Sequence, residues 1–232
     1  MREIIFDTET TGFEPQSGDR LVEIGCIELV NRVPTGQTFH AYYNPQRPMP
    51  AAAEAIHGLS DNFLRDKPLF SEGVEALLDF LGNCPLIAHN AQFDFGFLNH
   101  ELMRCGRDII DMVRMVDTIA MARTLHPGAK HSLDALCTRY GIDRSHRIKH
   151  GALLDAELLA QLYIELTGGR QIGFALATDI PATQAERTTA KPHIRIIRPA
   201  RAHRASAEEL ERHAAFIAGL NNPLWMELGP VA

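Results

Sequence analysis

The sequence has few cysteines, and those it has lie far apart. Its four cysteines, Cys26, Cys84, Cys105 and Cys137, form no C-x-x-C pair, which argues against a zinc ribbon and against the disulfide framework of a small secreted domain. No apolar run approaches the ~20 residues of a membrane-spanning helix, and the first residues lack the long apolar segment of a signal peptide. These absences favour a protein of the reducing cytoplasm that does not enter a membrane.

An excess of positive charge is lacking as well. The 232 residues include 23 Lys and Arg against 29 Asp and Glu, which gives a net charge of -6. Residues 1–169 alone have a net charge of -8, and residues 170–232 have +2. An acidic surface repels phosphate groups unless metal cations lie between them. Nucleic-acid binding by the first part of the chain would therefore depend on bound cations.

The apolar pattern predicts strands followed by helices. Extended runs at 4–6, 21–30 and 38–43 indicate three strands in a meander, and 85–88 indicates a fourth. The helical patterns cover 51–56, 72–81, 92–105, 113–124, 132–140 and 152–167. Ser71 is expected to begin one helix and Gly141 to end another. This order of elements indicates an α/β fold with a mixed central sheet flanked by helices.

The composition changes after Gly168-Gly169. Residues 177–205 are rich in Ala, Thr, Pro and Arg and show no sustained periodicity, so we expect a flexible basic linker over 170–205. Ser206 and Glu209 form an S-x-x-E capping box before a short amphipathic stretch. The expected organisation is one domain over 1–169, the linker, and a C-terminal segment over 206–232.

Two acids follow the first apolar run of the chain. Asp7 and Glu9 come directly after Ile4–Phe6, and residues two apart on a strand project to the same face. Two like charges on one face need a compensating cation. Taken alone, such a pair is more often a turn cap and a solvated acid at a strand end.

Three further residues give this acidic pair a chemical use. Asp94 falls in the first turns of the helix predicted over 92–105, and Asp155 falls in the helix predicted over 152–167. His150 is expected on the loop before that helix, because five residues correspond to ~140° around a helix and would separate it from Asp155. Carboxylate oxygens are ligands that Mg²⁺ and Mn²⁺ prefer, and histidine is suited to accept a proton near neutral pH.

Three motifs in these regions carry a family resemblance. D-T-E-T-T-G from residue 7, H-N-A-x-F-D from residue 89 and H-x-A-x-x-D from residue 150 together resemble the DEDDh class of 3′→5′ exonucleases, which have a ribonuclease H-like fold. The resemblance covers residues 3–167. The intervening Ile56-His57-Gly58 and residues 130–137 are similar to the proofreading subunits of bacterial replicative DNA polymerases.

The resemblance implies a two-metal active site. Asp7, Glu9, Asp94 and Asp155 would hold two divalent cations, Mg²⁺ or Mn²⁺, that flank the scissile phosphate, and His150 would be the general base. The product would be a nucleoside 5′-monophosphate.

The resemblance also implies contacts to the terminal nucleotide. The expected residues are Thr10, Thr11, Gly12, Ile56, His57, His89 and Phe93. Each has an ordinary alternative in a turn, in helix packing or at a strand end. Just before His150, the basic residues Arg144, Arg147 and Lys149 would hold backbone phosphates or lie on a solvated loop.

The tail resembles an adaptor. Residues 171–176 are a degenerate match to peptides that bind bacterial sliding clamps, with Gln171, Phe174 and Leu176 as anchors; a linker that packs Phe174 on the domain is the alternative. The apolar residues of the last segment are too few for an independent core. They include Phe216, Ile217, Leu220 and Trp225, and their segment resembles the one by which related subunits attach to the polymerase catalytic (alpha) subunit.

The leading interpretation is a proofreading exonuclease acting on the 3′ end of single-stranded DNA. A DEDDh exoribonuclease that trims RNA stays open, because these residues do not separate deoxyribose from ribose, although the tail is unnecessary for such an enzyme. A non-catalytic binding module is the third interpretation, and the complete set of four acids and His150 argues against it.

Overall fold

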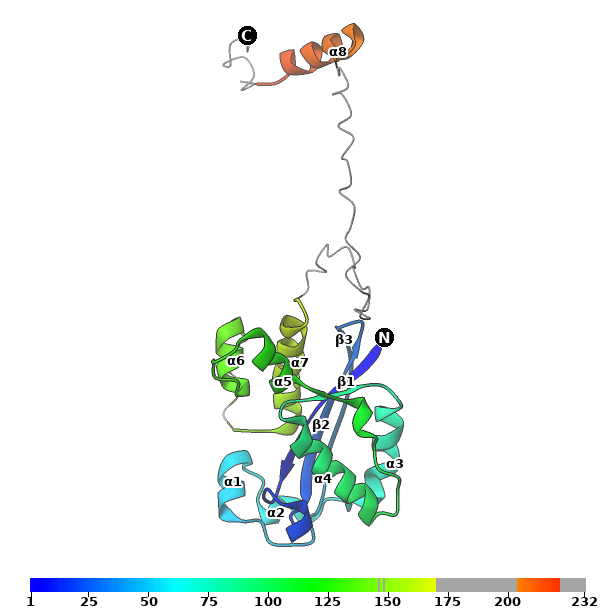
Figure 1. The fold of residues 1–232 in the computed structure, drawn as a ribbon, viewed down its shortest axis with the longest axis vertical. Coiled ribbons are helices and arrows are strands. Elements are labelled where there is room, and N and C mark those ends of the chain that lie inside the picture. The colour runs from blue at the N-terminus through cyan, green and yellow to red at the C-terminus, as the bar shows by residue number, and fades with distance from the viewer. Residues whose placement is uncertain (146, 148, 170–203, 222–232) are drawn as a thin grey trace, which may run out of the picture. The chain divides into compact units, whose positions relative to one another are not determined.

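A computed structural model of the protein describes residues 1–145, 147, 149–169 and 204–221 (Figure 1). By its internal contacts the chain divides into two units, Met1–Leu176 and Ala177–Ala232, and each is considered by itself. The expected clamp-binding residues Gln171, Phe174 and Leu176 lie outside the described residues. So do Trp225 and the linker as far as residue 203.

A mixed sheet organises the first unit, as predicted, and it has five strands where four were expected. The strand order is β3-β2-β1-β4-β5. The strands are β1 (Arg2–Thr10), β2 (Leu21–Val30), β3 (Val33–Tyr42), β4 (Leu86–Ala88) and β5 (Met115–Asp117). The first three form an antiparallel meander, whereas β1, β4 and β5 run parallel. The carboxyl ends of the parallel strands therefore meet at one edge of the sheet, which is where α/β proteins commonly bind ligands.

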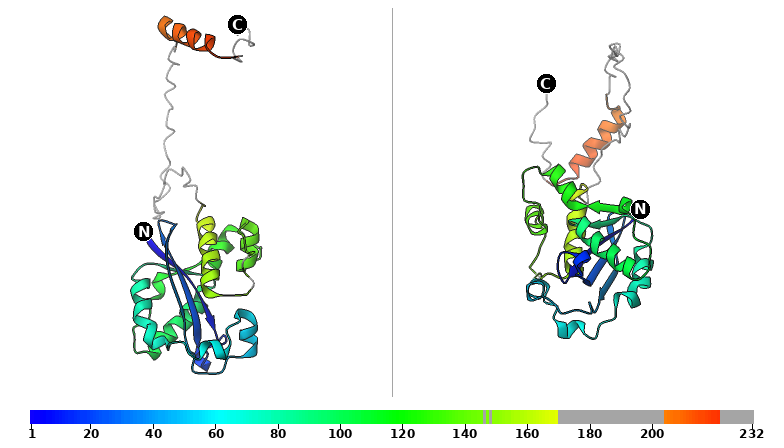
Figure 2. Two further views of the ribbon diagram at one scale, coloured as in Figure 1. Left: turned by 180° about the vertical axis from the view of Figure 1, so that it is seen from behind. Right: turned by 60° about the horizontal axis from the view of Figure 1, so that its bottom comes forward.

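Helices cover both faces of this sheet (Figures 1 and 2). On one face, α7 (Ala152–Leu166) packs on β1 and β2, and α5 (Thr118–Leu125) and α6 (Leu133–Tyr140) pack against α7. On the other face lie α3 (Phe70–Leu81) and α4 (Ala91–Arg104). The short segments are α1 (Ala51–His57), α2 (Asp61–Leu64) and the 3-10 turns η1 (Pro15–Ser17) and η2 (Met112–Arg114). Among the described residues, no helix combines the length and apolar content needed to cross a membrane.

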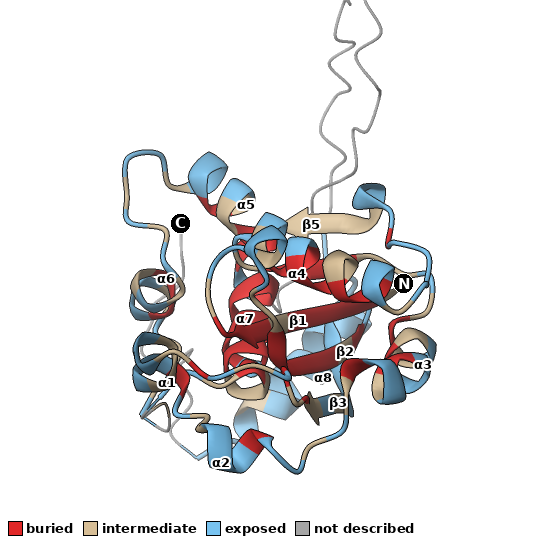
Figure 3. Cartoon of the chain, turned by 90° about the horizontal axis from the view of Figure 1, so that it is seen from below, coloured by how far each residue is buried: buried red, intermediate tan, exposed pale blue. Residues whose placement is uncertain are grey.

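The alternation of side chains along β1 gives the sheet a hydrophobic core on each face. Ile4 and Phe6 belong to the core under α3 and α4, where Phe6 meets Phe95 edge-on with ring centroids 5.6 Å apart. Ile5 belongs to the core under α7. Figure 3 shows β1, β2 and α7 largely buried. Fully burying one such side chain contributes ~1.5–3 kcal/mol to the free energy of folding. The buried residues of β1 therefore fix the position of the residues at its C-terminal end.

Two predicted elements are corrected by the structure. β1 extends through Thr10, so Asp7 and Glu9 lie within the strand and not after it. The reason is that pairing with β2 continues beyond the apolar run. The helix predicted over 113–124 contains the unpredicted strand β5. A strand of three residues is too short to show a period, and it exists because it pairs with β4.

Helix ends were predicted with mixed success. α3 begins at Phe70 after the N-cap residue Leu69, so Ser71 is not its cap. Instead, the Leu69 N–H donates to the Glu72 carboxylate at 2.6 Å, which satisfies an otherwise free backbone donor. Gly141 does end α6, with a left-handed φ of 68°.

The described part of the second unit contains α8 (Ala207–Ala218). Its predicted capping box is present, because Ser206 Oγ accepts from the Glu209 N–H at 3.3 Å and the Glu209 carboxylate accepts from the Ser206 N–H at 2.8 Å. The apolar residues Leu210 and Phe216 are 58% and 64% exposed.

Candidate active site

The outer half of β1 supplies the first two acids. Asp7 and Glu9 are opposite Gly25 and Glu23 of β2 in the antiparallel register. A Cβ atom built on Gly25 would lie 2.3 Å from Leu153 Cα. Glycine at this position therefore lets the first turn of α7 rest directly on the sheet, which brings the acid of that turn toward β1.

The third acid comes from α4, on the face of the sheet opposite α7. Asp94 lies in the first turn of α4, which follows β4 after Asn90, a residue in the left-handed region with φ of 65°. β4 is parallel to β1 and adjacent to it, so α4 begins beside the acidic end of β1. Asp94 is buried, and its Oδ1 accepts a hydrogen bond from Thr8 Oγ1 at 2.7 Å.

The fourth acid and the histidine complete the group. Asp155 is buried in the first turn of α7, and His150 lies on the preceding loop, as expected, with Nδ1 3.2 Å from Asp155 Oδ2. The backbone N–H of His150 donates to the backbone carbonyl of Ile56 at 3.4 Å, which links this loop to α1. One ligand atom each from Glu9, His150 and Asp155 lie within 4.8 Å of one another.

Burial is the main cause of the raised pKa values of these acids. Burial raises the pKa of Glu9 to about 8, with a further contribution from Glu23. Burial also raises the pKa of Asp94 to about 7, although the hydrogen bond from Thr8 opposes this change. The pKa of Asp7 lies well above its usual range because of burial and then the negative charge of Asp94. Carboxylates crowded in this way are stabilised in the charged form by a cation, and their hard oxygens suit Mg²⁺ or Mn²⁺.

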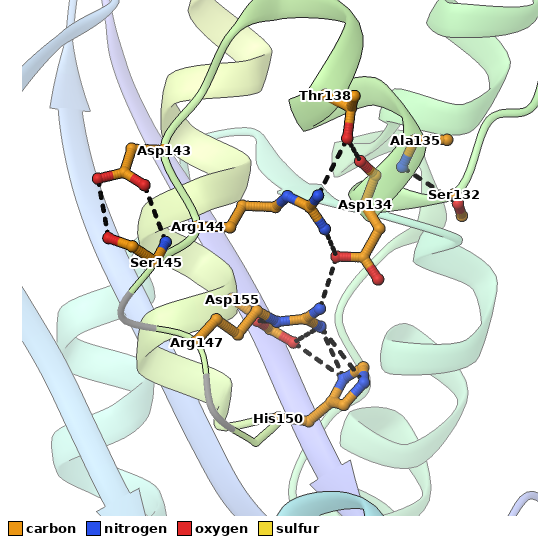
Figure 4. A network of polar contacts seen from close by, with 10 residues as sticks. All are labelled: Ser132, Asp134, Ala135, Thr138, Asp143, Arg144, Ser145, Arg147, His150 and Asp155. Atoms are coloured by element: carbon orange, nitrogen blue, oxygen red, sulfur yellow. Dashed lines mark hydrogen bonds and ion pairs between the residues drawn. The ribbon is translucent and has the colours of Figure 1, made fainter.

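An arginine lies in contact with this group (Figure 4). The Arg147 side chain is only 9% exposed, and its guanidinium contacts Asp155, His150 and Asp134. Burial opposes the charged form of Arg147, but the hydrogen bonds and charge of Asp155 outweigh it and raise the pKa of the guanidinium. The sequence placed Arg147 only in a general basic stretch, and its position among the acids depends on the path of the loop before α7.

A cavity of about 420 Å³ opens beside the acids, between β1 and α1. Glu9 lines it together with six of the seven residues expected to contact the nucleotide, namely Thr10, Thr11, Gly12, Ile56, His57 and Phe93. His89 does not line this cavity; its Nδ1 lies 2.9 Å from Thr118 Oγ1. Phe13 also lines the cavity and was missed by sequence reasoning, although it directly follows the first motif. Its ring is 76% exposed and its centroid lies 6.4 Å from that of Phe93.

One wall of the cavity contains a neutral histidine. The Leu59 N–H donates to His57 Nδ1 at 3.0 Å, so the neutral ring has its proton on Nε2. Nε2 is buried and has no hydrogen-bond partner among the described residues. Burial lowers the pKa of His57, which favours the neutral ring. The Thr10 backbone opposes this shift of the pKa, so the Nε2–H of the neutral ring lies near the end of β1.

A fifth acid, Glu23, lies on β2 next to the site and was not predicted from the sequence. Glu23 is 3% exposed, directly opposite Glu9 in the sheet, and its Oε1 lies 2.7 Å from His40 Nε2 of β3. The available signal was a charged residue within the otherwise apolar strand L-V-E-I-G-C-I. The pairing with Glu9 depends on the register of β1 and β2, which that pattern does not specify.

The chain is similar to known nucleases in sequence and in structure. The profile of the exonuclease family RNase_T matches residues 4–163. The DNA polymerase III subunit epsilon of Rickettsia felis is 46% identical over 229 residues, covering 95% of this chain and 97% of that protein. The corresponding Escherichia coli protein is 41% identical over 225 residues, covering 92% and 91%.

Solved structures give the same picture for the fold. Exonuclease X in complex with 5′-overhanging duplex DNA is 26% identical and superposes with a TM-score of 0.58, covering 71% of this chain and 90% of that one. The nuclease domain of 3′hExo, a DEDDh family member bound to rAMP, has a TM-score of 0.63 at 16% identity, covering 72% and 91%. The expected ribonuclease H-like exonuclease fold is confirmed.

Proposed function

The chain belongs to the exonuclease family and, within it, to the DNA polymerase III epsilon subunits; on this premise we propose that it is a proofreading 3′→5′ exonuclease of a bacterial replicative DNA polymerase. It would remove mismatched 3′-terminal nucleotides as 5′-monophosphates. The observation that carries the proposal is the convergence of Asp7, Glu9, Asp94 and Asp155 with His150, next to a nucleotide-sized cavity that Glu9 lines.

The acids would hold divalent cations, Mg²⁺ or Mn²⁺. Such ions, when bound, lower the pKa of water and stabilise negative charge on a phosphate group. Asp7 and Glu9 sit on the rigid strand β1, and Asp94 and Asp155 reach it from helices on opposite faces of the sheet. The carboxylates are thus fixed by three separate elements.

His150 would accept the proton of the attacking water. Its side chain is 48% exposed, so water can reach it, and its loop is tied to α1 through Ile56. A general base must lie within hydrogen-bond reach of the proton it removes, and the contact with Asp155 keeps the imidazole at the edge of the acid cluster. Asp155 would also stabilise the imidazolium that forms.

The cavity would receive the terminal nucleotide. Thr10, Thr11 and Gly12 form the turn at the end of β1, and Thr10 Oγ1 donates to the Gly12 carbonyl at 2.5 Å, which fixes the turn's shape. Ile56, Phe93 and Phe13 offer apolar surface on which a base can stack. The His57 ring would form part of the wall against which the nucleotide packs.

A substrate comparison tests this proposal. Time courses on single-stranded DNA, on a primer with a mismatched 3′ terminus and on RNA of the same sequence, each with Mg²⁺, should show faster release from the two DNA substrates. Faster trimming of RNA would instead assign the site to an exoribonuclease. A bound nucleic acid without any hydrolysis would favour a non-catalytic module.

The tail would connect the nuclease to the polymerase. We assign 1–169 to the nuclease, 170–205 to a linker with a sliding-clamp peptide at 171–176, and 206–232 to the segment that binds the catalytic subunit. The exposed apolar residues Leu210 and Phe216 of α8, and Leu220 just after it, support a segment that packs into a partner's groove. This assignment places the protein at the replisome in the bacterial cytoplasm.

A further inference from the structure

The guanidinium of Arg147 contacts both groups that the reaction requires at this edge of the site (Figure 4). Nε donates to Asp155 Oδ1 at 2.5 Å, and Nη2 donates to Asp155 Oδ2 at 2.6 Å. Both carboxylate oxygens are thus engaged in a bidentate pair, which is a strong arrangement for arginine and carboxylate. A cation that binds Asp155 has to compete with Arg147 for these oxygens.

The same side chain also engages His150. Nη2 lies 2.7 Å from His150 Nδ1. The same nitrogen lies 3.5 Å from His150 Nε2, so the guanidinium contacts the imidazole beside both ring nitrogens, and Nδ1 is also 3.2 Å from Asp155 Oδ2. Arg147 in this position therefore occupies a proposed metal ligand and contacts the side chain of His150 at the same time.

Arg147 has another anchor away from the acids. Its Nη1 donates to Asp134 Oδ1 at 2.8 Å, and the same oxygen accepts from Arg144 Nη1 at 2.7 Å. Asp134 is half exposed, and a cavity of about 780 Å³ lined by Asp134, Arg144 and Arg147 opens beside it. Arg147 can leave Asp155 and remain paired with Asp134, so its release from Asp155 does not leave an unpaired charge buried.

We propose that Arg147 is a displaceable counter-ion that alternates with a divalent cation at Asp155. In one arrangement Arg147 pairs with Asp155 and occupies His150, which neutralises the crowded acids and holds the site inactive. In the other, the cation binds Asp155, Arg147 is held by Asp134, and His150 is released from its contact with the guanidinium. The inference rests on the proposed function, because it assigns the cation to the same acids.

Titration of the full-length protein with Mn²⁺ alone tests the competition. Calorimetry of wild type and Arg147→Gln should show tighter binding to the variant by about tenfold, equivalent to ~1.4 kcal/mol. Arg144→Gln is the matched control, because Arg144 contacts Asp134 but not Asp155, and its affinity should stay within about twofold of wild type. Arg147→Lys retains the charge but not the bidentate pair, so its affinity should fall between wild type and Arg147→Gln.

Thermal unfolding in EDTA separates this role from simple support of the loop. Arg147→Gln should unfold at a lower temperature than wild type without cations, while binding Mn²⁺ more tightly. If Arg147 only supported the fold, its replacement would lower both the unfolding temperature and the affinity for Mn²⁺. Unchanged or weaker Mn²⁺ binding by Arg147→Gln and Arg147→Lys would overturn the inference.

These measurements use no nucleic acid, so they are independent of substrate choice. If wild type binds Mn²⁺ but hydrolyses no nucleic acid, the proposed function fails and the competition at Asp155 can still be measured. If wild type is an active exonuclease and Arg147→Gln does not bind Mn²⁺ more tightly, the inference about Arg147 fails and the proposed function stands.

Discussion

Replacing Glu9 by glutamine should stabilise the protein at alkaline pH when divalent cations are chelated. Burial raises the pKa of Glu9 from 4.5 to about 8 in the folded protein, whereas the unfolded chain keeps the ordinary value. Unfolding therefore releases a proton between these two pH values, and the free energy of unfolding decreases as the pH rises through the window. The cost of the charged carboxylate is absent below about pH 4.5 and fully present above about pH 8.

The size of the effect follows from the same interval. At ~1.36 kcal/mol for each pH unit, the interval corresponds to at most roughly 5 kcal/mol, and relaxation around the charged group reduces this limit. Glutamine has nearly the same shape and no charge. We expect the free energy of unfolding of Glu9→Gln to exceed that of wild type by about 2 kcal/mol at pH 8.5. This difference corresponds to a Tm higher by ~4–8 °C for a chain of this size.

Differential scanning calorimetry in EDTA at pH 5 and pH 8.5 measures the difference. The gap between variant and wild type should be small at pH 5 and open at pH 8.5. Glu157→Gln is the control, because Glu157 is exposed on α7, and an exposed change of this kind stays within ~0.5 kcal/mol. With excess Mg²⁺ the order should reverse, since wild type gains stability from the bound ion. A Glu9→Gln protein that is less stable than wild type in EDTA at pH 8.5 would refute the reasoning.

Three further changes test other parts of the account. His150→Ala should slow nucleotide release by ~10²–10⁴ while Mn²⁺ binding persists in calorimetry; loss of binding would make His150 a ligand instead. Gly25→Ala should cost roughly 1–3 kcal/mol in urea unfolding and reduce activity, because its Cβ meets the backbone of α7, whereas Gly96→Ala, with open space around its Cβ, should not destabilise. A chain ending at Gly169 should hydrolyse a free oligonucleotide but no longer co-purify with the polymerase catalytic subunit; retained co-purification would refute the role given to the tail.

Much of the site could be predicted because its residues occur in short, contiguous motifs. The two-residue spacing of Asp7 and Glu9 specifies a common face on a strand, and this is what β1 shows. The spacing of His150 and Asp155 would place them on different faces of one helix, which favoured the loop position for His150. The family resemblance supplied the expectation that these residues meet. Their convergence depends on β4 lying next to β1 and on the close approach of α7 to Gly25.

The parts that could not be predicted depend on tertiary pairing. β5 is three residues long and is specified by its neighbour β4. Glu23 gains its meaning only through the register that sets it opposite Glu9. Arg147 was one of several basic residues in a loop, and only the folded path of that loop places its guanidinium on Asp155 and His150. Local patterns contain no information about such contacts.

The central claim is that the four carboxylates hold the cations with which this protein shortens DNA from its 3′ end. The most direct measurement is the Mg²⁺-dependent release of 5′-mononucleotides from single-stranded DNA by wild type, Asp7→Ala and the exposed control Asp66→Ala. We predict that wild type and Asp66→Ala release nucleotides stepwise from the 3′ end only when Mg²⁺ or Mn²⁺ is present, and that Asp7→Ala falls to background. Release by Asp7→Ala at close to the wild-type rate would contradict the claim.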